Sequence, residues 1–297
     1  MNIKQSCLPR CRKTASTPIV DIISTLNQAI ALLSPKSDSA RTDAELLLAQ
    51  TLNKPRSYLY TWPDTELTPD QQKAFSNLLN RRLNGEPIAY ILGKKEFWSL
   101  ELLVSTATLI PRPETELLVE IALEKLPEHK TSYALDLGTG SGAIACALAK
   151  ERPLCQVLAI EFSHDALTVA RKNKEQLKLN NLTLEHSHWF DAIGESLHFD
   201  VIVSNPPYIA PDDPHLTQGD LRFEPNTALS TTNDGLADLF HIAQNAKKYL
   251  KPNGWLIMEH GYNQSAELIN KLKALNYQQV TDHNDYNNQP RIISGQI

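Results

Sequence analysis

The sequence predicts an α/β protein built on a doubly wound, mostly parallel seven-stranded sheet, preceded by a small helical domain and a β-hairpin linker. Three observations lead to this prediction. From Ser132 onward, short apolar runs alternate with segments of helical period, which is the pattern of βαβ units and a parallel sheet. The last two apolar runs are close enough in sequence to form a hairpin, so we expect an antiparallel edge strand. Before residue 86, the apolar residues recur at helical spacing.

The composition narrows the class of protein. The chain has 297 residues, 41% of them hydrophobic, which suits about two domains with a sizeable core. The net charge of −5 argues against broad non-specific DNA binding, for which a basic surface is expected. The four cysteines and the histidines show no metal-type spacing, so we expect a reduced, cytoplasmic chain without a metal site. No apolar run approaches the roughly 18 residues of a membrane span, and no membrane association is expected.

The first part of the chain is expected to hold a leader and a helical domain. Residues 1–16 are basic and lack the apolar core of a signal peptide, and we expect them to be disordered. Residues 17–85 should form helices that begin at Thr17-Pro18, near Asp38 and at Thr68-Pro69, with Asn84-Gly85 ending the last one. Residues 21–104 carry nine basic and ten acidic side chains, so no charge bias marks this region as a nucleic-acid surface.

A β-hairpin linker is expected at residues 86–110, where the spacing of the apolar residues changes. Its two strands should be residues 88–93 and 96–104. A helix from Leu117 to Leu126 should follow, because Pro113 suits a first turn and acidic residues at 114 and 116 suit the positive end of a helix dipole.

The α/β domain is expected at residues 111–297. Its predicted strands are residues 134–137, 157–160, 182–185, 199–204, 255–259, 278–281 and 291–294. Its predicted helices cover residues 143–150, a segment capped by Ser163, residues 236–250 and residues 266–275. Residues 209–233 form a long loop, and a loop of that length in a compact domain is usually a lid or a binding loop.

A glycine-rich loop follows the first of these strands and marks a ligand site. Its five residues are Gly138, Thr139, Gly140, Ser141 and Gly142. Glycines there let the backbone approach a ligand at the start of the next helix. The pattern also satisfies the dinucleotide fingerprint, so the loop alone does not separate NAD from S-adenosylmethionine.

Two acidic residues near the loop bear on the choice of ligand. Asp136 favours S-adenosylmethionine, since a carboxylate suits an ammonium group and would repel a pyrophosphate. Glu161 ends the second strand, where a carboxylate accepts ribose hydroxyls in either case.

A second motif, Asn205-Pro206-Pro207-Tyr208, follows the fourth strand of the domain. The two prolines have fixed φ and lack backbone N–H groups, so they hold the Asn205 side chain and nearby carbonyls rigidly. In open α/β sheets, ligands bind at this carboxyl edge. On its own the motif could equally be a proline turn that ends a strand.

Together these motifs resemble the class I S-adenosylmethionine-dependent methyltransferases, whose sheet is Rossmann-like. More narrowly, the chain is similar to the release-factor glutamine methyltransferases (the PrmC/HemK family) over roughly residues 18–297. The matching segments are residues 85–90, 93–97, 110–116, 136–142, 187–190, 205–208, 223–229 and 259–261.

The resemblance implies an activity, a cofactor and a partner. The expected enzyme transfers a methyl group from S-adenosylmethionine to the side-chain amide of the glutamine in the Gly-Gly-Gln motif of class 1 peptide chain release factors. Residues 17–85 would recognise the release factor, and a monomer without nucleic-acid partners is expected. Asn205 and the Pro206 carbonyl would accept hydrogen bonds from the amide, with Pro207 and Tyr208 beside them. The five loop residues, Glu161, Trp189 and Asn205 would contact the cofactor, with Trp189 against the adenine.

The chain departs from the family pattern at two positions. Glu161 stands where the family usually has Asp, and a longer carboxylate can still accept ribose hydroxyls. His188 stands where the family usually has an Asp that accepts from the adenine amine. A neutral histidine can also accept, so this contact is either altered or taken over by backbone groups.

Three other functions remain open from the sequence. A nucleic-acid amino-methyltransferase, acting on adenine or cytosine, also places Asn/Asp/Ser-Pro-Pro-aromatic against a planar amine, but needs a basic groove for a flipped base. An NAD-dependent oxidoreductase would explain the glycines and leave residues 205–208 without a role. A non-catalytic cofactor-binding protein has no need of Asn205.

Overall fold

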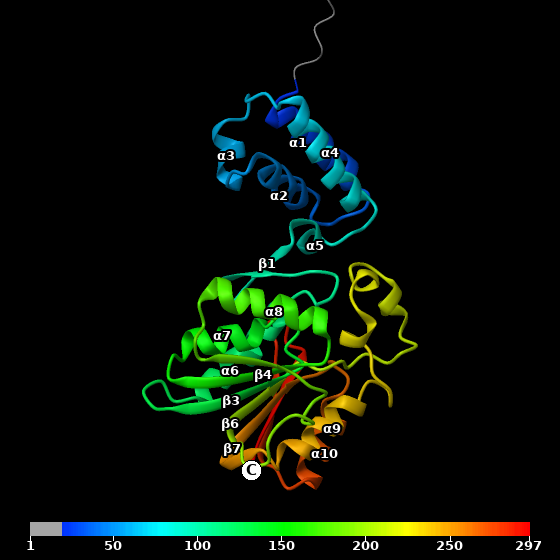
Figure 1. Cartoon of the computed structure of the whole chain (residues 1–297). Helices are drawn as coiled ribbons and strands as arrows, with labels where there is room; N and C mark the ends of the chain where they lie inside the picture. Colours follow the sequence, from blue (N-terminus) through cyan, green and yellow to red (C-terminus); the bar gives the residue numbers. More distant parts are fainter. Residues whose placement is uncertain (1–19) are drawn as a thin grey trace, which may run out of the picture. The chain divides into compact units, whose positions relative to one another are not determined.

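The computed structural model describes residues 20–297. The chain divides into two compact units, one ending at Gly85 and the other running from Glu86 to Ile297 (Figure 1). The expectation of a disordered leader at residues 1–16 and the predicted cap Thr17-Pro18 both lie outside the described residues. The candidate site lies entirely within the second unit.

The first unit is built from helices whose ends are set by capping residues. The helices are α1 (Ile22–Leu33), α2 (Ala40–Leu52), α3 (Arg56–Thr61) and α4 (Pro69–Leu83). Asp21 caps α1 through a 2.8 Å hydrogen bond from the Ser24 N–H. The predicted start at Thr68-Pro69 is confirmed, because Thr68 and Gln71 form a capping box and Pro69 occupies the first turn. Helix α3, which follows Pro55, was not predicted.

The β-hairpin begins later in the chain than predicted. Residues 88–93 were expected to be a strand, but Ile88–Leu92 is a helix, α5. Pro87 precedes its first turn and Gly93 ends it in the left-handed conformation, with φ +71°. Pro87 and Gly93 are residues typical of the start and the end of a helix. The five residues between them are too few to show a helical period in the sequence. The hairpin consists of β1 (Lys94–Phe97) and β2 (Leu100–Leu103), which pair antiparallel.

In the second unit, seven strands of the described chain form one mixed sheet in the order β5-β4-β3-β6-β7-β9-β8. They are β3 (Ser132–Leu137), β4 (Cys155–Glu161), β5 (Leu182–His186), β6 (Phe199–Ser204), β7 (Leu250–Glu259), β8 (Gln278–Asn284) and β9 (Pro290–Gln296). The predicted mostly parallel, doubly wound sheet is therefore confirmed. The expected antiparallel edge strand needs correction, because β9 is the antiparallel strand and lies between β7 and β8. The hairpin turn brings β9 back beside β7, which leaves β8 at the edge.

Helices cover both faces of the sheet (Figure 1). On one face lie α6 (Glu116–Lys125), α7 (Ala143–Glu151) and α8 (His164–Leu177), and on the other lie α9 (Ala237–Ala246) and α10 (Ser265–Ala274). Each layer has its own buried cluster, one joining α6 and α7 to the sheet and the other joining α9 and α10 to it. Both clusters use residues of β3 and β6, and these two strands carry the glycine loop and the Asn-Pro-Pro-Tyr motif at their ends.

The long loop at residues 209–233 is structured and closed at its base. It contains three 3-10 turns, η2 (Pro214–Thr217), η3 (Leu221–Phe223) and η4 (Asn226–Ala228). The Ile209 N–H donates to the Leu229 carbonyl and the Thr231 N–H donates to the Ile209 carbonyl, both at 3.0 Å. The loop therefore forms a wall of fixed shape beside the end of β6.

Candidate active site

A cavity of about 410 Å³ opens at the carboxyl ends of the central strands. The predicted site residues that line it are Gly138, Thr139, Ser141, Glu161, Trp189, Asn205 and Pro207. Gly140, Gly142, Pro206 and Tyr208 were also predicted as site residues and are not among the lining residues. The structure thus brings the glycine loop and the Asn-Pro-Pro-Tyr motif to one cavity, as expected of motifs at the ends of neighbouring parallel strands.

Gly138 and Gly142 of the loop are required for different physical reasons. Gly138, at φ +71°, faces the indole of Trp189, and a Cβ atom there would lie 3.3 Å from the ring. Gly142, at φ +83°, packs instead against Ala170, whose Cβ atom would be 3.3 Å away. Gly138 therefore keeps the cavity floor open under Trp189, whereas Gly142 lets α7 begin close to α8.

Glu161 holds the loop and also lines the cavity. Its Oε2 accepts a 2.8 Å hydrogen bond from the Gly140 N–H, and its Oε1 accepts one of 2.8 Å from the Ser163 N–H. This explains how Gly140 contributes without touching the cavity. Each carboxylate oxygen keeps a second lone pair, so the half-buried side chain can also accept hydroxyl donors from a ligand.

Asp136 lies beneath the loop, fully buried, and does not line the cavity. Its Oδ2 accepts a 2.6 Å hydrogen bond from the Thr139 hydroxyl, while Oδ1 has no partner among the described residues. Burial raises the pKa of this carboxyl to about 7, and the Thr139 hydrogen bond offsets part of the effect. The carboxyl expected near the loop is therefore buried beneath it rather than exposed at the cavity surface.

Trp189 and His188 line the same cavity as Asn205. The Trp189 indole packs over Gly138 of the glycine loop and lines the cavity. The His188 side chain also lines the cavity and is 55% exposed, with its Nδ1 atom 3.7 Å from Asp191 Oδ2. The Phe162 ring meets His188 edge-on, 5.5 Å between centroids. His188 therefore lies on the solvent-exposed side of the cavity, not on the side formed by the core.

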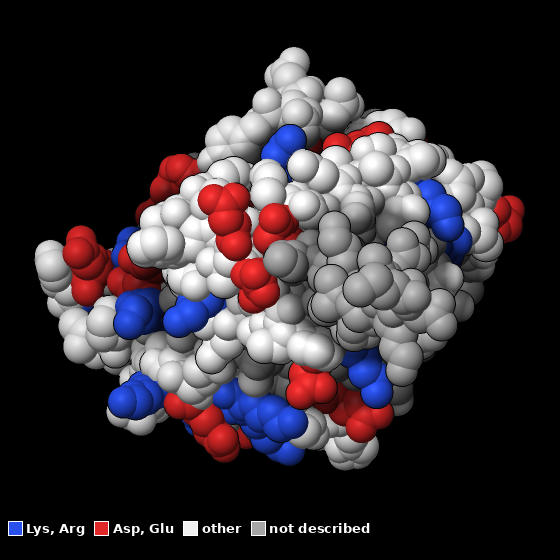
Figure 2. Space-filling view, turned by 90° about the horizontal axis from the view of Figure 1, so that it is seen from above, with Lys and Arg blue, Asp and Glu red and all other residues white. Residues whose placement is uncertain are grey.

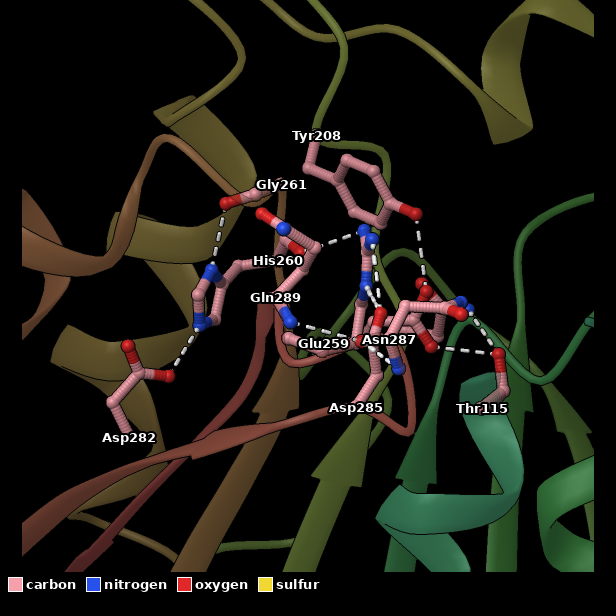
Figure 3. A network of polar contacts seen from close by, with 11 residues as sticks. Thr115, Tyr208, Glu259, His260, Gly261, Asp282, Asp285, Asn287 and Gln289 are labelled. Atoms are coloured by element: carbon pink, nitrogen blue, oxygen red, sulfur yellow. Dashed lines mark hydrogen bonds and ion pairs between the residues drawn. The ribbon is translucent and has the colours of Figure 1, made fainter. Parts of the chain in front are cut away.

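The Asn-Pro-Pro-Tyr motif is held from behind by polar contacts (Figure 3). Asn205 donates from Nδ2 to Thr115 Oγ1 at 3.2 Å. The Tyr208 hydroxyl donates to Glu259 Oε1 at 3.0 Å, and its backbone carbonyl accepts from Gln264 Nε2 at 2.9 Å. The ring of Tyr208 therefore lies behind the cavity wall. Burial, with the charge of Glu259, raises its pKa, so the phenol stays protonated and keeps donating.

Four residues shape the site that the sequence did not single out for it. Thr115 and Arg112 line the cavity, and Glu259 and Glu224 are buried carboxylates that bind them. Arg112 forms an ion pair with Glu224, and the Ile110 N–H also donates to that carboxylate at 3.3 Å. Glu224 belongs to the long loop, so this contact fixes the loop beside the cavity. The available signal was that all four lie in segments that match the family pattern, residues 110–116, 223–229 and 259–261, but such a match does not name the partner of each residue.

The residues of the cavity suit S-adenosylmethionine. The unpartnered carboxyl oxygen of Asp136 favours a cationic ligand nearby. The cradle of Gly138 under the Trp189 indole suits a flat ring, and Glu161 offers acceptors for paired hydroxyls. Among residues 20–297, His, Cys, Asp and Glu side chains form no group of three or more that could hold a metal ion. The fold and this site define an S-adenosylmethionine-dependent methyltransferase.

Comparison with known proteins specifies the family. A model described as methyltransferase domain matches residues 128–297, and one described as PrmC N-terminal domain matches residues 24–93. The chain is 48% identical over 274 residues to the release factor glutamine methyltransferase of Shewanella oneidensis, covering 92% of this chain and 95% of that one. It is 45% identical to the Escherichia coli protein of the same name, covering 91% and 96%. The chain belongs to the release factor glutamine methyltransferases.

The fold is also shared with more distant proteins of known structure. A methyltransferase from Pyrococcus furiosus aligns with a TM-score of 0.52 at 20% identity, over 74% of this chain and 98% of that one. At that identity the likeness concerns the sheet and its helices alone. No helix within residues 20–297 is both long and apolar enough to cross a bilayer.

Proposed function

We propose that this enzyme methylates the side-chain amide nitrogen of the glutamine in the Gly-Gly-Gln motif of class 1 peptide chain release factors. Family membership supports the choice of a release factor glutamine. The observation that carries the chemistry is the position of Asn205, which lines the same cavity as the glycine loop and Glu161. A planar amide placed between them would have its nitrogen within the cavity.

The roles of the site residues follow from their contacts. The backbone of residues 138–142, the carboxylate of Glu161 and the indole of Trp189 would hold the cofactor, with Asn205 at its reactive end. When bound, S-adenosylmethionine supplies a methyl group on a positively charged sulfur. Asn205 Oδ1 and the Pro206 carbonyl would accept the two amide N–H bonds, with Pro207 and Tyr208 keeping that segment rigid.

The enzyme needs these two acceptors because an amide nitrogen is by itself a poor nucleophile. Accepting both N–H bonds raises the electron density on nitrogen and turns its lone pair toward the methyl group. Positioning of this kind can supply several kcal/mol of rate acceleration, on the order of 7 for well-oriented groups. No general base is needed, since the methylated nitrogen loses its proton readily.

The two units suggest a division of labour. We assign residues 17–85 to release factor recognition, residues 86–110 to a linker and residues 111–297 to catalysis, which agrees with the division of the chain after Gly85. We also assign the enzyme to the cytoplasm as a monomer. Light scattering on the purified enzyme measures its molar mass and so tests whether it is a monomer. Deleting the helical unit should preserve cofactor binding and abolish release factor methylation, and unchanged methylation would contradict this assignment.

A nucleic-acid amine is the chemical alternative to a glutamine amide. On the face shown in Figure 2, blue and red side chains are interspersed among the described residues, without a continuous basic band. The chain as a whole carries a net charge of −5. Both observations favour a protein substrate over a nucleic acid.

The proposal is tested by identifying the methylated residue. Purified release factor is incubated with enzyme and S-adenosylmethionine, digested and examined by mass spectrometry. The proposal expects one methyl group on the glutamine of the Gly-Gly-Gln peptide. A methyl group on any other residue, or none, would overturn it.

A further inference from the structure

Glu259, at the end of β7, is 1% exposed and has both carboxylate oxygens engaged. Its Oε2 accepts a 2.6 Å hydrogen bond from the Thr115 hydroxyl, and its Oε1 accepts the 3.0 Å bond from Tyr208. Figure 3 shows the Thr115 and Tyr208 side chains both meeting the carboxylate of Glu259. A carboxylate so deeply buried is costly unless it is fully hydrogen-bonded, which makes it a strong acceptor for both hydroxyls.

The direction of these bonds determines how Thr115 can meet Asn205. A threonine hydroxyl has one hydrogen, and here that hydrogen is donated to Glu259. Oγ1 can therefore only accept from its other neighbour. The Asn205 amide group satisfies this by turning Nδ2 toward Thr115, at 3.2 Å. The opposite rotamer would place Oδ1 against an oxygen that has no hydrogen to give, and the two would repel.

We propose that Glu259 and Thr115 are positioning residues that fix the amide orientation of Asn205, so that Oδ1 faces the substrate. The inference rests on the proposed function, in which Oδ1 accepts an N–H bond from the substrate glutamine. If the amide turned over, its NH2 group would meet the NH2 group of the substrate, and the acceptor that orients the nucleophile would be lost.

Two of the three residues in this chain of hydrogen bonds lie at the cavity. Thr115 and Asn205 line it, whereas Glu259 is behind them and touches neither cofactor nor substrate space. Thr115 is itself fixed in the short turn η1 (Pro113–Thr115), where its N–H donates to the Arg112 carbonyl at 3.1 Å. The buried Glu259 carboxylate therefore fixes the orientation of the Asn205 amide through one intervening group, the Thr115 hydroxyl.

The decisive variants change the Thr115 hydroxyl with little change in shape. Thr115→Val removes the acceptor and should lower kcat by roughly 10-fold to 100-fold, a typical cost of losing the alignment of a reacting group. The KM for release factor and the affinity for S-adenosylhomocysteine should stay within about 3-fold, since the binding contacts remain. Thr115→Ser retains the hydroxyl and should restore kcat.

A double-variant cycle tests whether Glu259 acts through Thr115. Glu259→Leu alone should also lower kcat, because the freed Thr115 hydroxyl can then donate to Asn205 Oδ1 and hold it away from the substrate. In the Thr115→Val background the same change should cost much less in kcat than it does alone, because only the Tyr208 contact of Glu259 is then left to lose, whereas independent effects would add. Thr168→Val is the matched control, because the Thr168 hydroxyl donates to the His164 carbonyl at 2.9 Å within α8 and Thr168 is not among the residues that line the cavity. It should leave kcat unchanged.

The outcomes separate this inference from the proposed function. Wild-type enzyme that transfers no methyl group to release factor would refute the proposed function. Active wild type with an equally active Thr115→Val variant would overturn the positioning role, as would a Thr115→Ser variant that loses as much kcat as Thr115→Val. A change in KM or cofactor affinity at constant kcat would make Thr115 a binding residue and also overturn it. These results do not require Glu259→Leu to fold.

Discussion

The Nδ2 atom of Asn205 lies 3.2 Å from the hydroxyl oxygen of Thr115, although 90 residues separate the two in sequence. Thr115 belongs to the turn η1, directly before helix α6, and Asn205 directly follows strand β6. The contact joins the Pro-Arg-Pro-Glu-Thr-Glu segment to the Asn-Pro-Pro-Tyr motif. The Pro-Arg-Pro-Glu-Thr-Glu segment therefore contributes to the site as well as beginning a helix.

Replacing Asn205 should separate catalysis from cofactor binding. In Asn205→Ala the acceptor for the substrate amide is missing, so turnover should fall by on the order of 100-fold or more. The cofactor contacts of the glycine loop and Glu161 remain, so the affinity for S-adenosylhomocysteine should change little. Single-turnover methylation and titration calorimetry measure the two quantities. Near-normal turnover would remove Asn205 from the catalytic role.

Glu161→Gln should weaken cofactor binding more than it slows methyl transfer. The Gly140 and Ser163 N–H groups both donate to Glu161, and an amide offers only one acceptor oxygen, so its NH2 group would oppose one of them. We expect roughly 10-fold weaker binding, since a lost charge-assisted hydrogen bond costs about 1.5 kcal/mol or more. Glu185→Gln, at an exposed position of β5, is the control and should bind normally. Equal affinities for the two variants would contradict the assigned role.

Much of the catalytic unit could be predicted from local pattern. The strand at residues 199–204 has the predicted ends, because it is a short apolar run bounded by a proline turn. The helix at Ile88–Leu92 was mistaken for a strand, since five residues are too few to show a period. The antiparallel strand was placed at the edge because chain order alone does not say which strand of a hairpin pairs with the sheet.

The same limit applies to the site. Residues 138–142, Glu161 and Asn205 each belong to a local motif, and all were predicted. The contact between Thr115 and Glu259 spans 144 residues and involves one hydroxyl and one carboxylate. No spacing rule connects residues so far apart, so only the fold brings them together. The buried position of Asp136 beneath the loop likewise depends on how β3 is covered.

The ion pair between Arg112 and Glu224 should be important for stability. The Glu224 side chain is fully buried, and burial raises its pKa even with Arg112 beside it. Arg112→Ala would leave that carboxyl without its cation, which typically costs about 3 kcal/mol. The pKa would rise further, so the loss of stability should be greater at pH 8, where the carboxyl must ionise, than at pH 5.

Chemical denaturation at the two pH values measures this effect. Lys94→Ala is the matched control, because Lys94 and Glu101 form an exposed pair in the hairpin, and such pairs contribute about 1 kcal/mol or less. Equal losses for the two variants would show that Glu224 gains little from Arg112.

Asp136 should make the stability of the free enzyme depend on pH. Its pKa is about 7 in the folded chain and 3.8 in the ordinary, unfolded case. The folded state therefore holds a proton that the unfolded state releases, and its contribution is full below about pH 4 and lost as pH rises through 7. Each unit of pKa difference corresponds to about 1.4 kcal/mol.

Asp136→Asn isolates this contribution, since asparagine does not titrate. Whatever the constant offset between the two proteins, the difference in unfolding free energy should move in favour of the variant between pH 5 and pH 8. Guanidinium unfolding curves across that range provide the measurement. A difference that stays constant with pH would mean that Asp136 is not the titrating group.

The most direct test of the central claim is a methyl-transfer assay with labelled S-adenosylmethionine and alternative acceptors. Purified release factor, the same factor with its Gly-Gly-Gln glutamine replaced, duplex DNA and single-stranded DNA are offered separately. We predict label on the intact release factor and none on the other three. Label on DNA, with none on the release factor, would contradict the account and mean that residues 205–208 receive a flipped base.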